Sequence, residues 1–155
     1  MIKQLTLDKP TEYRVFYNDT INILYKKYPD AKVLDVGVGS YWDYSDIWTN
    51  YTSIDINGKA HITRSITDSG LPDNSYDIIL CNGMYEYVDD AEKMIQEIHR
   101  ILKPAGIALF GFIGIEYKYH GANGRKYKEE NLFEAFKPIE ITKFNQEYYY
   151  ITCVK

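Results

Sequence analysis

Val-Leu-Asp-Val-Gly-Val-Gly-Ser, residues 33–40, is the most informative part of this sequence. Its short apolar run suits a strand buried in a parallel sheet. Gly37 and Gly39 follow the run at once, and glycines at that point let the backbone approach a ligand where a side chain would collide. Because open α/β sheets bind ligands beyond the carboxyl ends of their strands, the stretch predicts a ligand-binding turn after a central strand.

The spacing of the glycines disfavours one class of ligand. A dinucleotide fingerprint needs Gly-x-Gly-x-x-Gly, whose third glycine permits close helix packing beside a pyrophosphate. Counted from Gly37 and Gly39, the third position falls on Trp42. A nicotinamide or flavin dinucleotide is therefore not expected.

A second acid ends the next apolar run, residues 52–56, which read Thr-Ser-Ile-Asp-Ile. Asp55 then lies at the end of a strand, twenty positions after Asp35. A carboxylate in this place can accept both hydroxyl protons of a ribose. An acid at a strand end is also common on protein surfaces, so the ribose role depends on the rest of the chain.

Four segments in this order resemble class I S-adenosylmethionine-dependent methyltransferases, in the minimal form of the methyltransferase type 11 domain. The first motif of that family is Asp-x-Gly-x-Gly-x-Gly, which Asp35, Gly37 and Gly39 match, with Tyr41 in place of the last glycine. Residues 52–56 stand as the second segment, and residues 71–80 and 97–106 look like the fourth-strand and fifth-strand segments. The resemblance covers residues 31–113 and implies methyl transfer from S-adenosyl-L-methionine by in-line displacement.

The resemblance also implies a cofactor site. The two glycines of the turn would run along the methionine part, Asp35 would help to hold its amino group, and Asp55 would bind the ribose. The acid that usually meets the adenine amino group is replaced by Ser65, and Asp68 follows three residues later. The full expected set of cofactor-binding residues is Asp35, Gly37, Gly39, Asp55, Ile56, Ser65, Ile66, Asn82 and Met84.

Residues 82–88, Asn-Gly-Met-Tyr-Glu-Tyr-Val, resemble the stretch where many relatives carry Leu-Glu-His-Val, with Tyr87 in place of the histidine. Tyr85, Glu86 and Tyr87 are candidates to reach the acceptor, and the alternative for the aromatic residues is packing. Asn82 to Tyr85 also has the spacing of the Asn-Pro-Pro-Tyr motif of amino-methylating DNA enzymes, but both prolines are absent. No catalytic residue is assigned, because a base is needed only when the protonated acceptor is a poor nucleophile.

The composition bounds the remaining classes. With 155 residues, 45% of them apolar, the chain is expected to form one domain over residues 1–155. A net charge of −4 and only a modest basic group in residues 118–128 argue against a dedicated nucleic-acid surface. No apolar run reaches the roughly 20 residues of a membrane span, so a cytoplasmic location is expected. Cys81 and Cys153 are interpreted as buried free thiols, and the histidine and cysteine spacing predicts no metal site.

The apolar periodicity predicts a helix over residues 11–28 and another from Ala91 to Leu102, capped by Asp89 or Asp90 and stopped by Pro104 with Gly106. Strands are expected at 31–36, 52–56, 60–65, 76–81 and 107–113, a short helix at 44–51, a last helix at 129–136, and a hairpin from 139–144 and 148–154.

Only three residues separate the second and third expected strands, too few for a crossover helix. Either these strands form a hairpin or the chain makes an extended excursion and bends back along the sheet edge. The expected fold is α/β: a single Rossmann-like, doubly wound sheet of about seven strands. The strand order expected from the resemblance is 3-2-1-4-5-7-6, with an antiparallel C-terminal hairpin and no helix after strand two.

Two other functions stay open from the sequence. A non-catalytic subunit that binds S-adenosylmethionine or adenosine, or that regulates a partner, would also keep this fold, and Tyr41, Ser65 and the missing helix favour it. A nucleotide-binding protein with another use for adenosine fits Asp55 but not the fourth and fifth segments.

The sequence does not identify the acceptor, which is a small molecule, a sugar chain, a protein or a nucleic acid. The aromatic residues at 41–44 and 116–120, with His120, follow strand ends on the ligand side, where loops usually set substrate choice. A partner subunit is another way in which the site could be completed.

Overall fold

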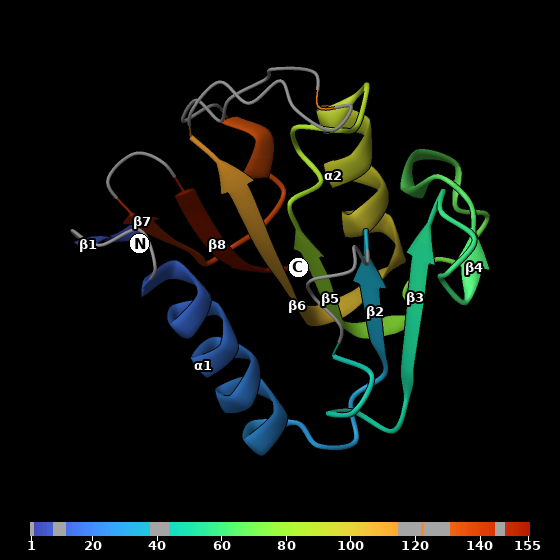
Figure 1. The fold of residues 1–155 in the computed structure, drawn as a ribbon, viewed down its shortest axis with the longest axis horizontal. Helices are drawn as coiled ribbons and strands as arrows, with labels where there is room; N and C mark the ends of the chain where they lie inside the picture. Colours follow the sequence, from blue (N-terminus) through green and yellow to red (C-terminus); the bar gives the residue numbers. More distant parts are fainter. Residues whose placement is uncertain (1, 8–11, 38–43, 115–121, 123–130, 145–147) are drawn as a thin grey trace.

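The computed structural model describes residues 2–7, 12–37, 44–114, 122, 131–144 and 148–155. Within them, one eight-stranded sheet has the order β1-β7-β8-β6-β5-β2-β3-β4 (Figure 1). The strands are β1 (Ile2–Leu7), β2 (Val33–Val36), β3 (Tyr51–Asp55), β4 (Ile62–Thr63), β5 (Tyr76–Asn82), β6 (Leu102–Ile113), β7 (Ile139–Phe144) and β8 (Tyr148–Val154). The helices are α1 (Glu12–Lys27) and α2 (Ala91–Ile101), with 3-10 turns at Ile66–Asp68 and Asn131–Phe133.

The predicted strand order is confirmed, because 3-2-1-4-5-7-6 corresponds to β4-β3-β2-β5-β6-β8-β7. One strand was not predicted: β1 adds to the edge of the sheet and pairs in parallel with β7. The strands β4, β3, β2, β5 and β6 run parallel to one another, and β8 is antiparallel to both β6 and β7. The carboxyl ends of β2, β3, β5 and β6 therefore meet at one edge of the sheet.

Two apolar layers cover the two faces of this sheet. On one face, Met94, Ile95 and Ile98 of α2 are buried in a cluster that includes Leu34 and Val36 of β2. The α2 stripe was predicted, and the Asp90 side chain caps the helix by accepting a hydrogen bond from the Lys93 N–H at 3.0 Å. On the other face, α1 packs through its buried side chains against alternate residues of the same strands; this cluster includes Tyr17, Ile21, Val33, Ile78, Leu80 and Leu109.

The short helix predicted over residues 44–51 is wrong. The chain forms turns there, and Tyr51 already belongs to β3. The Tyr44 hydroxyl donates to Asn18 of α1 at 3.0 Å, and the Trp48 indole N–H donates to the Tyr28 carbonyl at 3.1 Å. Both rings are buried against α1, so tertiary anchoring overrides the local helical pattern.

The third expected strand, residues 60–65, is only the two-residue β4, and it is parallel to β3. Parallel pairing excludes the hairpin and confirms the excursion along the edge. His61 holds the start of this excursion, because its Nδ1 accepts from the Ser53 N–H at 3.0 Å and its N–H donates to Ser53 Oγ at 3.0 Å. Side-chain hydrogen bonds thus replace part of a strand ladder.

Two predicted helix boundaries also differ. Helix α2 ends at Ile101, and β6 begins at the next residue, so Pro104 and Gly106 lie inside β6 rather than ending the helix. The backbone at 105–106 pairs instead with Lys155, whose N–H donates to Gly106 and whose carbonyl accepts from Ala105, both at 3.0 Å. Of the last helix predicted over 129–136, the described part contains only the 3-10 turn Asn131–Phe133.

The hairpin of β7 and β8 has the predicted bounds. Gly39, Tyr41, Trp42, His120 and the basic residues of 118–128 lie outside the described residues. Within the part of the chain that the structure describes, none of the helices is long and apolar enough to cross a membrane.

Candidate functional site

The turn after β2 brings Gly37 against the segment that follows β5. Gly37 has a φ of +75°, and a Cβ placed on it would lie 2.1 Å from Met84 Sδ and 2.4 Å from Met84 Cγ. Its N–H donates to the Ile54 carbonyl of β3 at 2.9 Å. Only glycine fits here, and the turn joins the ends of β2, β3 and β5 at the predicted edge of the sheet.

Asp35 lies directly below this turn and is 4% exposed. The Tyr51 hydroxyl donates to Asp35 Oδ2 at 2.5 Å. Burial raises the pKa of Tyr17 and of Tyr44, and the negative charge of Asp35 raises both pKa values further. The motif acid is therefore a buried carboxylate among tyrosines. Its predicted contact with a cofactor amino group stays a prediction.

The end of β3 presents an acid beside an uncovered apolar side chain. Asp55 is partly exposed, and its Oδ1 accepts from the Asn57 N–H at 3.0 Å. Ile56, the next residue, is 77% exposed, which makes it the most exposed large hydrophobic side chain of the described residues. A ligand that combines a diol with a flat apolar ring would satisfy both groups at once.

The residues expected at the adenine end are engaged within the protein. Ser65 caps the 3-10 turn that follows β4, and its Oγ accepts from the Thr67 N–H at 3.3 Å. The Ile66 side chain is 3% exposed and belongs to the core. Asp68 forms an exposed ion pair with Arg64, with 3.4 Å between Asp68 Oδ2 and the nearest guanidinium nitrogen. These positions offer a ligand mainly backbone groups.

Asn82, the last residue of β5, carries a buried amide. It is 6% exposed, and neither Oδ1 nor Nδ2 has a hydrogen-bond partner among the described residues. The amide lies over Gly111 of β6, where a Cβ would be 2.0 Å from Asn82 Oδ1 and 2.8 Å from Tyr150 Cε1. An unsatisfied buried polar group costs roughly 1–3 kcal/mol, so this amide is a natural contact for a ligand.

Glu86 is the second unsatisfied polar residue in the same segment. It is 3% exposed, and among the described residues its Oε2 has no hydrogen-bond partner. None of the ion pairs of the described residues includes it. Burial raises the pKa of Glu86 to about 7, although its own backbone N–H stabilises the charged form. Its charge in turn contributes to a raised pKa of the buried Cys81 thiol.

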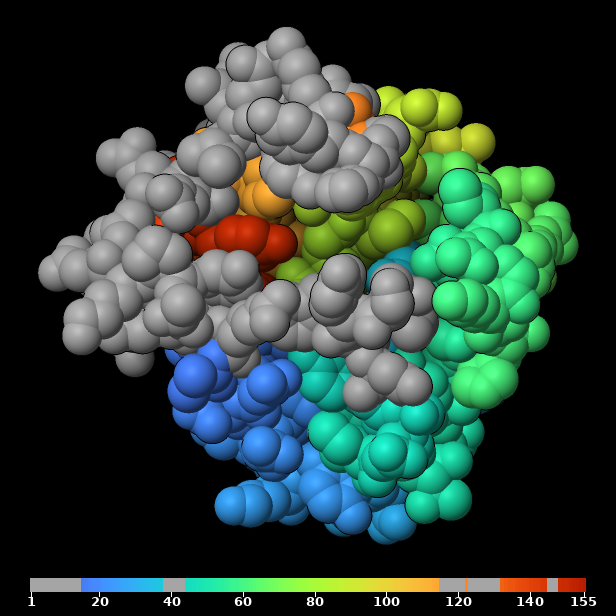
Figure 2. Space-filling view, in the orientation of Figure 1, coloured from blue at the N-terminus to red at the C-terminus, as the bar shows by residue number. Residues whose placement is uncertain are grey.

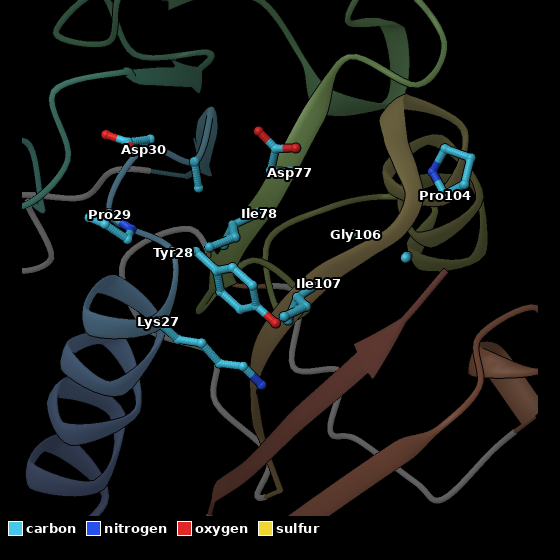
Figure 3. A pocket seen from close by; sticks show the side chains of 11 residues that line it. Lys27, Tyr28, Pro29, Asp30, Asp77, Ile78, Pro104, Gly106 and Ile107 are labelled. Atoms are coloured by element: carbon cyan, nitrogen blue, oxygen red, sulfur yellow. The ribbon is translucent and has the colours of Figure 1, made fainter.

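The surface above this edge is hollowed. Figure 2 shows the recess with olive-coloured atoms of the segment after β5 and red atoms of β8 on its floor. A separate cavity of about 410 Å³ lies at the opposite edge of the sheet, near the amino-terminal ends of β2 and β5 and beside residues 104–107 of β6 (Figure 3). Its lining includes Lys27, Tyr28, Asp30 and Asp77, none of which is near the glycine turn, so this cavity is not the predicted cofactor site. The described residues contain no cluster of three metal-ligating side chains.

The structure thus brings Gly37, Asp55, Ile56, Asn82 and Met84 to one edge of the sheet, as predicted. Two contacts were not predicted from the sequence: Tyr51 as the partner of Asp35, and Gly111 as the platform for Asn82. A glycine inside an apolar strand is a signal of close approach by another group, and Gly111 lies between Phe110 and Phe112. That signal was available, whereas the Tyr51 contact depends on strand register.

Known proteins resemble this chain in sequence and in fold. Residues 34–110 match the methyltransferase domain family. An uncharacterised protein of Methanocaldococcus jannaschii is 26% identical over 148 residues, which cover 85% of this chain and 72% of that protein.

Solved structures share the fold. The N-methyltransferase NodS from Bradyrhizobium japonicum superposes with a TM-score of 0.70 at 14% identity, covering 96% of this chain and 99% of that one. The 1,6-didemethyltoxoflavin N1-methyltransferase of Burkholderia thailandensis, solved with S-adenosylhomocysteine, gives 0.66 at 17% identity over 96% and 91% of the two chains. Residues 34–110 therefore form a methyltransferase domain, and the described residues have the fold of class I S-adenosylmethionine-dependent methyltransferases.

Proposed function

We propose that the protein transfers the methyl group of S-adenosyl-L-methionine to an acceptor bound in the recess at the carboxyl ends of β2, β5 and β6. The observation that carries the proposal is the convergence of Gly37, Asp55 and Ile56 at that edge. A backbone turn that excludes any side chain, a partly exposed carboxylate and an uncovered apolar surface match the three parts of an adenosyl amino acid.

The residues at this edge fit that molecule. Asp55 has one oxygen bonded to the Asn57 N–H, and its other oxygen is available to the ribose hydroxyls. Ile56 offers the adenine ring an apolar surface that is otherwise left in water. The unsatisfied amide of Asn82 has a donor and an acceptor for the polar end of the methionine part.

S-adenosylmethionine supplies an electrophilic methyl group on a sulfonium, and the protein's task is to align the acceptor with it. Because the displacement is in line, most of the acceleration comes from holding the nucleophile and the methyl carbon in that geometry. The segment after β5 lies between the glycine turn and the end of β6, where it contacts both. It is therefore in place to orient the acceptor and to exclude water.

Calorimetric titration with S-adenosylhomocysteine tests the proposal. The parent chain is expected to bind with a micromolar Kd, equivalent to about 8 kcal/mol, and more tightly than it binds ATP. Asp55→Ala is expected to weaken binding at least tenfold. Asp30→Ala, which removes an exposed carboxylate at the opposite edge of the sheet, is the matched control and is expected to leave the Kd unchanged. Equal affinity of the Asp55 variant and the parent would contradict the site assignment.

A further inference from the structure

The carboxyl group of Glu86 is buried, and none of the described residues supplies it with a counter-charge. It is 3% exposed, takes part in none of the ion pairs of the described residues, and leaves Oε2 without a hydrogen-bond partner there. A buried charge is stable only when it is paired and hydrogen-bonded. The folded chain therefore retains an acid whose partner has to come from outside the described residues.

Glu86 lies in a segment that contacts the proposed site. Its Oε1 lies 3.6 Å from the point where a Cβ of Gly83 would be, so the carboxyl group lies against the backbone of Gly83. The next residue, Met84, packs directly on Gly37 of the glycine turn. The Gly83 N–H donates to the Gly111 carbonyl at the end of β6 at 2.9 Å. Glu86 thus belongs to the same short segment as Met84, which contacts the turn proposed to hold the methyl donor.

The chemistry of the ligand follows from what this carboxyl group lacks. A hydroxyl acceptor would supply a hydrogen bond but no charge, and the proton of an aliphatic hydroxyl is also far less acidic than that of an ammonium group. An ammonium group supplies both, because it is a cation with several N–H donors. Its pKa, near that of lysine at about 10.4, is also within reach of a buried carboxylate.

We propose that the methyl acceptor is a primary or secondary amine and that Glu86 is the base that receives its proton; this inference rests on the methyltransferase function proposed above. The amine enters as an ammonium ion and pairs with the Glu86 carboxylate. One N–H proton moves to Oε2, which frees the nitrogen lone pair. The nitrogen then forms the bond to the methyl carbon as the carbon–sulfur bond breaks, and S-adenosylhomocysteine leaves as a neutral thioether. The methylated product departs as an ammonium ion, and Glu86 returns its proton to solvent.

Three tethered compounds test this assignment without knowledge of the natural acceptor. In each, a nitrogen replaces the sulfur of S-adenosylhomocysteine and carries a 2-aminoethyl, a 2-hydroxyethyl or a propyl group where the methyl would be. The adenosyl part then delivers the terminal group to the place of the acceptor. Calorimetry at pH 8 is expected to show that the aminoethyl compound binds the parent at least tenfold more tightly than the other two.

Glu86→Gln keeps the shape of the side chain and removes its charge. This variant is expected to reduce the preference for the aminoethyl compound to less than threefold and to leave the Kd of S-adenosylhomocysteine unchanged. Glu92→Gln on the exposed side of α2 is the matched control and is expected to keep the preference.

Each other outcome overturns the assignment in a distinct way. A parent that binds S-adenosylhomocysteine without preferring the aminoethyl compound refutes the amine proposal alone. A preference that survives in Glu86→Gln refutes the role of Glu86. A tenfold loss of S-adenosylhomocysteine affinity in this variant shows that Glu86 holds the methionine ammonium instead. A parent that does not bind S-adenosylhomocysteine overturns the proposed function, and this inference with it.

Discussion

Replacing Glu86 by glutamine is expected to change how the stability of the protein depends on pH. Burial raises the pKa of Glu86 from 4.5 to about 7. In the pH range between these values the folded state binds more protons than the unfolded state, so the parent loses stability as the pH rises. The loss is complete above pH 7 and absent below pH 4.5. At 1.36 kcal/mol per pH unit, it amounts to about 3 kcal/mol.

Glutamine has no proton to lose and fits the same space. The stability of Glu86→Gln relative to the parent is therefore expected to increase by about 3 kcal/mol between pH 4.5 and pH 8. Urea unfolding of both proteins, followed by far-ultraviolet circular dichroism at half-unit pH steps, measures this difference. The one described titratable group that couples to Glu86 is Cys81 of β5, whose thiol stays protonated over this range because burial raises its pKa.

Glu140→Gln on β7 is the matched control, because this glutamate is exposed. Its stability relative to the parent is expected to follow no trend like that of the Glu86 variant. A difference between Glu86→Gln and the parent that stays constant from pH 4.5 to pH 8 would refute the reasoning. It would mean that water, polar groups or positive charges surround the carboxyl group and keep it ionised.

Gly111→Ala inserts a methyl group 2.0 Å from Asn82 Oδ1, and calorimetry is expected to show at least tenfold weaker binding of S-adenosylhomocysteine, with about 1–3 kcal/mol lost in urea unfolding. Tyr51→Phe removes a donor to a buried carboxylate and is expected to cost roughly 1–3 kcal/mol in the same unfolding assay. Its control is Tyr28→Phe, at a ring that is 38% exposed; this change is expected to cost less than about 0.5 kcal/mol, as is usual for substitutions on the surface. Lys155→Met removes the ammonium group that donates to two carbonyl groups at the carboxyl end of α2, at 2.8 and 3.3 Å, and is expected to cost about 1 kcal/mol; unchanged hydrogen exchange in the last turn of α2 would contradict this.

The central part of the fold was predictable because its signals are local. The apolar runs of β2 and β5, the stripe of α2 and the glycine turn at Gly37 each lie within a few residues of sequence. The edge strand β1 was missed, because its residues do not alternate regularly between apolar and polar and its partner β7 lies at the other end of the chain. The helix at 44–51 was wrongly predicted because local periodicity carries no information on long-range contacts. Tyr44 is anchored by Asn18 of α1, and Trp48 is anchored by Tyr28, just after α1.

The candidate site was likewise predictable only in part. Asp35, Asp55 and Asn82 were predicted as site residues because they lie at or directly after the ends of predicted strands. Their partners were not, because these come from strands that are adjacent only in the folded sheet. Tyr51 reaches Asp35 across the pairing of β2 with β3, and Asn82 rests on the strand that pairs with β5. That none of the described residues forms an ion pair with Glu86 is likewise seen only in the folded structure and not in any motif.

Asn82 at the end of β5 and Glu86 in the segment after it keep polar atoms without partners among the described residues, because their surroundings hold this part of the chain firmly. Tyr85 packs on Phe112 with 4.6 Å between the ring centroids, and the Gly83 backbone is bonded to β6. A purely structural glutamate in this position would make the protein less stable when it is replaced. The arrangement predicts the opposite for Glu86: its replacement by glutamine raises stability at pH 8 and abolishes the preference for an amine. These two changes have opposite signs in one variant, so together they separate a group retained for its chemistry from one retained for folding.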